Sequence, residues 1–250
     1  MRVLLFSLVL MLGISGCATD TDVDSEKIND ASNYNAQLGV AYLQQGRFEL
    51  ALNKLKKSIQ QNQDNADAHH YIAELYHQLG KTSLAKEHFE IALDLAPENS
   101  SLKNNYGVFL CEQKEFSLSK KLFLEVSNDP LYANKSRLHE NIGLCAREKG
   151  DLKAAEKYFR KTLREAPNSA KSLLALAEMS FDRQKYNDAK KYFYNYLKVS
   201  RHNAASLWLG ILLEKRAGNT SLVESYSVLL KGKFPDSKEA RLLKKMESRQ

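Results

Sequence analysis

The chain repeats a pattern of small and large apolar residues with a period of about 34 residues. One series consists of small residues, at Gly39, Ala73, Gly107, Gly143, Ala177 and Gly210. A second series consists of large apolar residues, at Leu55, Phe89, Phe123, Phe159, Phe193 and Tyr226. The two series advance by the same steps, and both take a longer step between their third and fourth members. Two independent positions that keep one spacing along the chain indicate an internal structural repeat.

The offsets inside each repeat predict two helices joined by a tight turn. Apolar residues four positions apart, such as Ile72 and Tyr76, share one face of a helix. A glycine follows where this first helix must end, at Gly46, Gly80 and Gly150. A second amphipathic helix comes next, and a proline lies past its end at Pro97, Pro167 and Pro235. The small residues allow the two helices to approach closely, and the large residue fills the space between them.

This pattern resembles the tetratricopeptide repeat, a helix-turn-helix unit of about 34 residues. The matching residues of the most regular unit are Tyr76, Gly80, Ala85, Phe89, Ala92 and Pro97, and the resemblance covers about 200 of the 250 residues. It implies an all-α fold, a superhelical solenoid of about six repeats with a C-terminal capping helix. We expect the repeats at about 32–65, 66–99, 100–135, 136–169, 170–203 and 204–235. The third is lengthened around Asp129–Tyr132, and residues 236–250 form the capping helix and tail.

The N-terminal segment predicts a signal peptide at residues 1–16. Arg2 precedes an apolar stretch from Val3 to Ile14, which is shorter than the roughly 20 residues that a membrane span needs. Residues 14–17, Ile-Ser-Gly-Cys, resemble the bacterial lipobox, which implies that Cys17 is acylated and carries palmitate as a membrane anchor. Ala18, where inner-membrane lipoproteins have Asp, favours the outer membrane. The alternative is an ordinary secretory signal with an incidental cysteine.

The composition of the residues after Cys17 predicts an acidic tether. Residues 17–31 contain few apolar side chains and five acids, at Asp20, Asp22, Asp24, Glu26 and Asp30. Such a composition buries too little surface to fold, so we expect a flexible spacer.

Two further cysteines, Cys111 and Cys145, lie one repeat length apart on the first helices of consecutive repeats. In a compartment outside the cytoplasm, disulfides form and persist. We therefore expect either a disulfide that joins two adjacent repeats or two buried thiols.

A narrower resemblance is carried by residues 104–111 (Asn-Asn-Tyr-Gly-Val-Phe-Leu-Cys), 140–145 (Glu-Asn-Ile-Gly-Leu-Cys) and 129–132 (Asp-Pro-Leu-Tyr). These segments are similar to those of the type IV pilus biogenesis and stability lipoproteins, six-repeat outer-membrane proteins of which some are called pilotins. The resemblance implies a periplasm-facing protein that assists localisation or assembly of the pilus secretin ring. The alternative is a generic lipoprotein scaffold for outer-membrane protein insertion or peptidoglycan remodelling.

The net charge and the motifs of the chain limit the classes of function that we expect. The chain has 37 Lys and Arg against 30 Asp and Glu, a net charge of +7 that builds up in the C-terminal half. We expect most of these basic side chains to lie on solvent-exposed helix faces. The alternative interpretation is that they attract anionic lipid headgroups or acidic peptidoglycan components. Binding of nucleic acid is not expected. The sequence shows no phosphate loop, nucleophile elbow or paired zinc cysteines. We therefore expect a binding protein that is not an enzyme and has no cofactor and no small-molecule substrate.

The first helices of such repeat arrays line a concave surface that binds partners. The expected partner-binding groove consists of Asn33, Ala36, Val40, Leu43, His70, Glu74, His77, Asn104, Val108 and Glu112. Val40 and Leu43 are expected to leave an apolar strip open for a helix or an extended peptide, the alternative being that the tether covers them. His70, Glu74 and His77 share one helix face, so a zinc site is conceivable, but a polar groove stripe is the simpler interpretation.

Overall fold

The computed structural model describes residues 20–248, and the side chains of residues 27–248. This range contains thirteen α-helices and no strand, so the all-α prediction is confirmed. The helices are α1 (Asp20–Gln44), α2 (Phe48–Gln61), α3 (Ala66–Gln78), α4 (Thr82–Leu95), α5 (Ser100–Glu112), α6 (Phe116–Asn128), α7 (Lys135–Glu148), α8 (Leu152–Glu165), α9 (Ala170–Asp182), α10 (Tyr186–Val199), α11 (Ala204–Ala217), α12 (Thr220–Lys233) and α13 (Lys238–Glu247). The predicted signal peptide and Cys17 lie outside the described residues.

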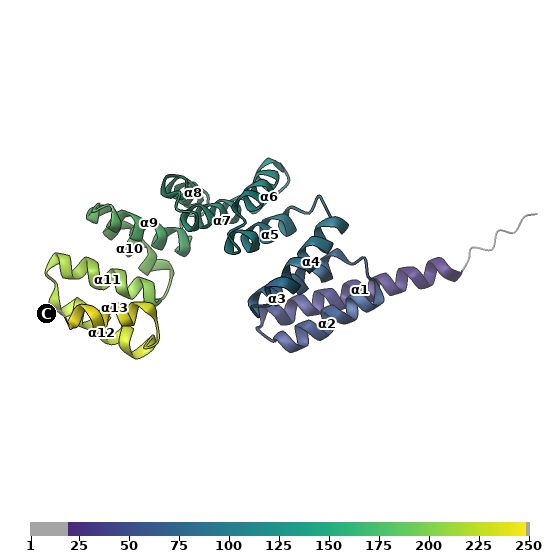
Figure 1. Cartoon of the computed structure of the whole chain (residues 1–250), viewed down its shortest axis with the longest axis horizontal. Helices are drawn as coiled ribbons and strands as arrows, with labels where there is room; N and C mark the ends of the chain where they lie inside the picture. Colours follow the sequence, from purple (N-terminus) through teal and green to yellow (C-terminus); the bar gives the residue numbers. More distant parts are fainter. Residues whose placement is uncertain (1–19, 249–250) are drawn as a thin grey trace, which may run out of the picture. The chain divides into compact units, whose positions relative to one another are not determined.

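The helices form two compact units (Figure 1). Unit 1 contains α1–α4 and ends at Pro97, and unit 2 contains α5–α13 and begins at Glu98. In each unit, consecutive helices pair across a short turn, which gives two pairs in unit 1 and four in unit 2. The pairs fall at the positions where the sequence pattern places its repeats.

Each pair is held by the small residue of its first helix against the large residue of its second. A Cβ atom added to Gly143 would lie 2.8 Å from the ring of Phe159. A Cβ on Gly107 would lie 2.7 Å from the ring of Phe123. Such distances leave no room for a side chain, so the two helices touch through backbone and ring. Phe159 is fully buried as a result.

The turn between the paired helices needs one residue with a positive φ angle. Gly80 supplies it in the second repeat, with φ of 69°. In the third and fifth repeats the same position is taken by Lys114 and Gln184, with φ of 63° and 60°. The glycine pattern alone missed these two turns. Packing of the flanking helices outweighs the roughly 1–2 kcal/mol that a side chain costs in this conformation.

The two-residue insertion in the third repeat is tied to the core. Tyr132 is 8% exposed and packs with Phe123, Val126 and Leu138. The Asp129 carboxylate accepts hydrogen bonds from the Ser100 hydroxyl at 2.6 Å and from the backbone of Leu131 at 2.8 Å. The hydrogen bond from Ser100 is the main cause that lowers the pKa of Asp129. The insertion is therefore a structured turn.

The acidic tether differs from the expectation, because residues 20–31 belong to α1. Among residues 27–44 of this helix, Ser32 is the first that is buried, and its hydroxyl donates to the backbone oxygen of Ser58 in α2 at 2.9 Å. Residues 27–30, ahead of it, are exposed. Acidic residues near a helix N-terminus interact favourably with the helix dipole. The N-terminal part of α1 can therefore stay helical without burying apolar surface, because the rest of the helix is docked.

The last helix covers the end of unit 2. Ala240 and Leu243 of α13 are buried against Leu207, Ile211 and Leu230 of α11 and α12. The other face of α13 carries exposed lysines and arginine. This is the arrangement expected of a capping helix, which closes an apolar face that would otherwise meet water.

We predict that Gly143→Ala destabilises unit 2 by about 1–3 kcal/mol, because the new methyl group overlaps the Phe159 ring. Gly232→Ala is the matched control, since a Cβ at Gly232 of α12 meets nothing within 4 Å. That variant should be neutral or stabilising by up to about 1 kcal/mol. Thermal denaturation followed by circular dichroism measures both. Equal melting temperatures for Gly143→Ala and the wild type would contradict the proposed contact.

Candidate functional site

A hollow of about 400 Å³ lies on the first-helix side of unit 2, between α5 and α7. We call it the α5–α7 hollow. It is lined by Val108, Cys111, Glu112, Asn141, Leu144, Cys145, Arg147 and Glu148. It contains apolar, acidic and basic groups within one concavity, which is a composition suited to a polypeptide. Two residues of the predicted groove, Val108 and Glu112, belong to it.

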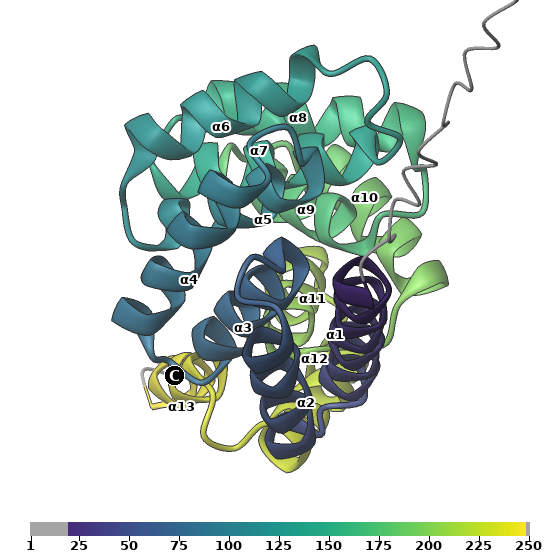
Figure 2. The same cartoon turned by 90° about the vertical axis from the view of Figure 1, so that its right-hand side faces the viewer.

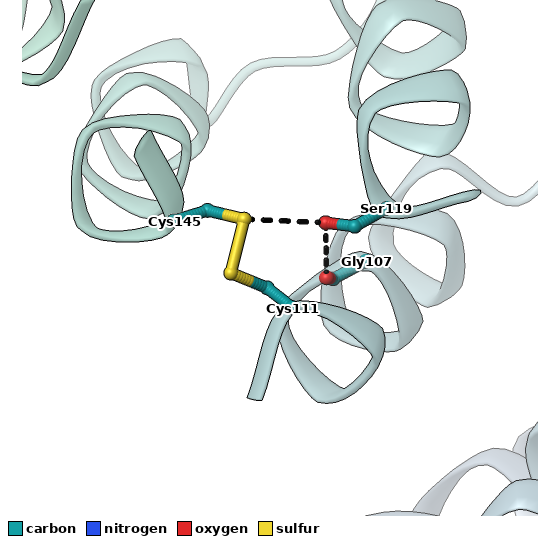
Figure 3. The surroundings of a disulfide bond; sticks show 4 residues. All are labelled: Gly107, Cys111, Ser119 and Cys145. Carbon is teal, nitrogen blue, oxygen red and sulfur yellow. Dashed lines mark hydrogen bonds between the residues drawn. A yellow bond between two sulfur atoms is a disulfide. The ribbon is translucent and has the colours of Figure 1, made fainter. Parts of the chain in front are cut away.

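The disulfide that the sequence allowed is present in the hollow (Figure 3). Cys111 of α5 and Cys145 of α7 are bonded, with their Cα atoms 5.7 Å apart. Ser119 of α6 lies against the bond: its hydroxyl donates to the Gly107 backbone oxygen at 2.7 Å and is 3.6 Å from the Cys145 sulfur. The disulfide therefore fixes the separation of the two helices that line the hollow.

Polar contacts extend this cross-linking along the first helices. The Asn141 amide of α7 donates to the Asn104 side-chain oxygen of α5 at 3.1 Å. Arg147 of α7 forms an ion pair with Glu178 of α9 at 2.8 Å. Burial raises the pKa of Glu178, and the nearby guanidinium of Arg147 opposes that rise. Helices α5, α7 and α9 thus present one continuous, internally bonded surface.

Four residues of the predicted groove are buried and cannot line an open surface. They are Ala36, Leu43, His70 and Asn104, with exposed fractions of 4%, 7%, 3% and 1%. Leu43 packs with Ala51 of α2 and Leu75 of α3, so the expected open strip at Val40 and Leu43 does not exist. The following repeat covers this face of α1. His70 faces the core, where its ring lies 6.2 Å from the ring of Phe89.

The remaining predicted positions reach the surface in part. Asn33 and Glu112 are exposed, and Val40, Glu74, His77 and Val108 are half-buried. The sequence prediction missed Asn141, Leu144, Arg147 and Glu148. The longer repeat step that separates Gly107 from Gly143 also carries Val108 to Leu144 and Glu112 to Glu148. Applying the same step to the predicted groove residues Val108 and Glu112 would have added Leu144 and Glu148 to the prediction.

Unit 1 contains a pair of histidines in direct contact. The Nδ1 atoms of His69 in α3 and His88 in α4 are 3.0 Å apart. The His69 Nε2 lies 3.1 Å from the Gln63 backbone oxygen and donates to it, so its Nδ1 accepts from His88. Burial is the main cause that lowers both pKa values, and His69 further lowers that of His88. Asp64, Glu87 and Lys56 are the charged groups that act on the pair.

Within the part of the chain that the structure describes, His70, Glu74 and His77 do not form a metal site, and no other group of three or more candidate ligands does. Over the same range, every helix is too short or too polar to cross a membrane.

Comparison with known families identifies the repeats. Models of the TPR or tetratricopeptide repeat match residues 39–80, 66–99 and 128–170. The matched segments include helices of both units. The tetratricopeptide-repeat fold expected from the sequence is therefore confirmed.

Comparison with individual proteins extends over nearly the whole chain. It is 34% identical over 235 residues to the type IV pilus assembly protein PilF of Pseudomonas aeruginosa, covering 92% of this chain and 93% of that protein. A solved structure of P. aeruginosa PilF superposes with a TM-score of 0.77 at 33% identity, covering 88% of this chain and 99% of that one. The crystal structure of PilW, described as a widely conserved type IV pilus biogenesis factor, gives 0.74 at 28% identity, covering 85% and 97%.

We predict that breaking the disulfide destabilises unit 2 by about 3–4 kcal/mol, because the bond closes a loop with a sequence separation of 34 residues. Urea denaturation of Cys111→Ser, Cys145→Ser and the double variant measures this. All three should lose the same stability, since either single substitution removes the bond. Mass spectrometry of non-reduced peptides provides the direct check, and two free thiols in protein secreted to an oxidising compartment would contradict the bond.

We also predict that acid destabilises unit 1 through the histidine pair. Because the folded-state pKa values lie below the ordinary value of 6.5, the unfolded chain binds more protons as the pH falls. The stability is therefore fully present above pH 6.5 and is lost progressively below it. The melting temperature should fall between pH 7.5 and pH 5.5, and His69→Gln with His88→Gln should reduce this fall. His202, whose pKa burial also lowers, leaves a residual shift in unit 2. An unchanged fall in the double variant would contradict the prediction.

Proposed function

Because the chain belongs to the PilF family of tetratricopeptide-repeat type IV pilus biogenesis proteins, we propose that it is a periplasmic scaffold for the pilus secretin. In this proposal it is anchored to the outer membrane by acylated Cys17 and binds a secretin subunit. It thereby assists localisation or multimerisation of the secretin ring. The observation that carries the proposal is the 34% identity to PilF across 92% of the chain.

The surface of unit 2 supports a role in binding protein. The α5–α7 hollow combines apolar Val108 and Leu144 with the exposed acids Glu112 and Glu148. The disulfide holds its two walls at a fixed separation, so a partner meets a surface that is ordered before binding. Preorganisation of this kind lowers the entropy cost of association. We place the contact with the secretin subunit at this hollow.

The proposed scaffold needs no chemistry of its own. A tetratricopeptide array offers rigid surfaces for recognition, and the residues that line the hollow include no nucleophile paired with a base. The disulfide occupies both of its cysteines. We propose that the protein acts by binding alone, without catalysis.

Deletion of the gene tests the function. We expect detergent-resistant secretin multimers and surface pili to disappear, while bulk outer-membrane proteins remain at normal levels, and the wild-type gene to restore both. Retention of the multimers in the deletion strain would contradict the secretin proposal. Joint loss of unrelated outer-membrane proteins would favour a general envelope scaffold.

Complementation with variants separates the site from the anchor. Glu112→Lys with Glu148→Lys should fail to restore multimers, whereas Glu98→Lys with Asp236→Lys, which makes the same charge change at exposed positions outside the hollow, should succeed. Equal restoration by both pairs would show that the contact lies outside the hollow and would leave the proposed function itself untouched.

For the anchor, radiolabelled palmitate should be incorporated into the wild-type protein and not into Cys17→Ser. Cleaved but unlabelled wild-type protein would contradict the lipid anchor.

A further inference from the structure

A second hollow lies on the second-helix side of unit 2, bounded by α6, α7 and α8. Figure 2 shows α7 between the other two helices. The hollow has a volume of about 260 Å³ and is lined mainly by apolar side chains, among them Phe123, Ile142 and Tyr158. Leu124 at its edge is 57% exposed. We call it the α6–α8 pocket. It is slightly smaller than the roughly 300–1,000 Å³ of small-molecule sites, and its size suits inserted side chains of a polypeptide.

Two positions that hold large side chains in the first three repeats hold alanine in this pocket. Ala146 of α7 occupies the position that Tyr42, Tyr76 and Leu110 hold in the first three repeats. Ala154 of α8 occupies the position that Leu50, Leu84 and Leu118 hold. Both alanines line the pocket. The two alanines therefore contribute to a concave apolar surface at the junction of the third and fourth repeats, where the insertion lies between α6 and α7.

The rim of the pocket is positively charged. Lys120 and Lys149 line it, both are exposed, and neither has an ion-pair partner among residues 27–248. The third charged lining residue, Asp151, already accepts a hydrogen bond from the backbone of Ala154 as the N-cap of α8. Two ammonium groups and one carboxylate therefore line the pocket, which gives the lining an excess of positive charge over an apolar floor.

The carboxylates of α6 and α8 do not neutralise this rim. Glu125 is paired with Lys103 at 2.8 Å. Glu165 contacts His139 at 2.9 Å, and Glu156 is shared by Arg160 and Arg183. Unit 2 as a whole, residues 98–250, carries 29 Lys and Arg against 18 Asp and Glu. The local and the wider field both favour an anionic ligand.

We propose that the α6–α8 pocket docks an acidic amphipathic helix of a protein partner. Apolar side chains at helical spacing enter the pocket over Ile142 and Ala146, and carboxylates beside them pair with Lys120 and Lys149. The groove between α6 and α8 receives the helix lengthwise, as in other helix-in-groove complexes. An anionic membrane would satisfy the lysines but would leave the apolar floor between the helices unfilled. The inference goes beyond the proposed function, since it concerns a surface separate from the α5–α7 hollow and any partner with this chemistry.

A synthetic peptide tests the docking chemistry on the folded chain without its signal peptide. The probe is a fluorescently labelled amphipathic helix with leucines on one face and glutamates beside them, and the control peptide has lysines in place of the glutamates. Fluorescence polarisation should show binding of the acidic peptide, weakening with added salt, and no binding of the basic one.

Variants of the protein locate the site. Ala154→Leu restores the residue of three other repeats and fills the pocket, so it should weaken acidic-peptide binding at least tenfold with an unchanged melting temperature. Lys120→Glu with Lys149→Glu should do the same. Lys191→Glu with Lys238→Glu makes the same charge change on α10 and α13, outside the pocket, and should leave the affinity within about twofold.

Three outcomes would overturn the proposal. The first is absence of acidic-peptide binding to the wild type. The second is equal binding by the wild type and Ala154→Leu, and the third is equal loss in both lysine pairs, which would indicate net charge alone. Vesicles containing anionic phospholipid are measured in parallel. Binding to vesicles that depends on Lys120 and Lys149, without peptide binding, would assign the surface to a membrane instead.

Discussion

The close approach of two helices through a residue without a side chain is the constraint on which the rest of this structure depends. Gly143 has no space for a Cβ because the Phe159 ring occupies it, and the same relation recurs one repeat earlier between Gly107 and Phe123. Once a pair of helices is fixed at this distance, its outer faces are fixed too. The next repeat can then dock only in one register, which sets where every surface residue lies.

This constraint explains why the fold could be predicted and the site only in part. The residues that set helix pairing, such as Phe89 and Phe193, recur at a regular step, so periodicity finds them without any structure. Surface residue types follow the repeat step only in part, as where Glu112 is followed by Glu148. Leu43 was expected in the open groove because α1 has no preceding repeat, but the packing of α2 and α3 against it decides its burial. Tertiary contacts decide which face of a helix the next repeat covers, and the spacing of residues within one helix does not reveal these contacts.

Departures from the repeat pattern mark the places where the surface acquires distinct properties. The insertion after α6 is held by Tyr132 and Asp129, and it makes the step from the third repeat to the fourth longer than the steps before it. Cys111 and Cys145 are separated by the ordinary step instead, so they do not occupy equivalent positions in their repeats. They nevertheless meet, because α5 and α7 lie side by side. The insertion is the reason why these two cysteines hold non-equivalent positions, since it lengthens the repeat step that lies between them.

Cys145 borders both the α5–α7 hollow and the α6–α8 pocket, which makes α7 the common wall of two different surfaces. On the first-helix side, this wall offers Leu144 and Arg147 next to exposed acids. On the second-helix side, it offers Ile142 and Ala146 next to unpaired lysines. The disulfide anchors this helix to α5, so a ligand in either hollow meets a wall that is already fixed. A single cross-link therefore preorders two surfaces of opposite local charge, whose linings have the Cys145 side chain in common and otherwise consist of different residues.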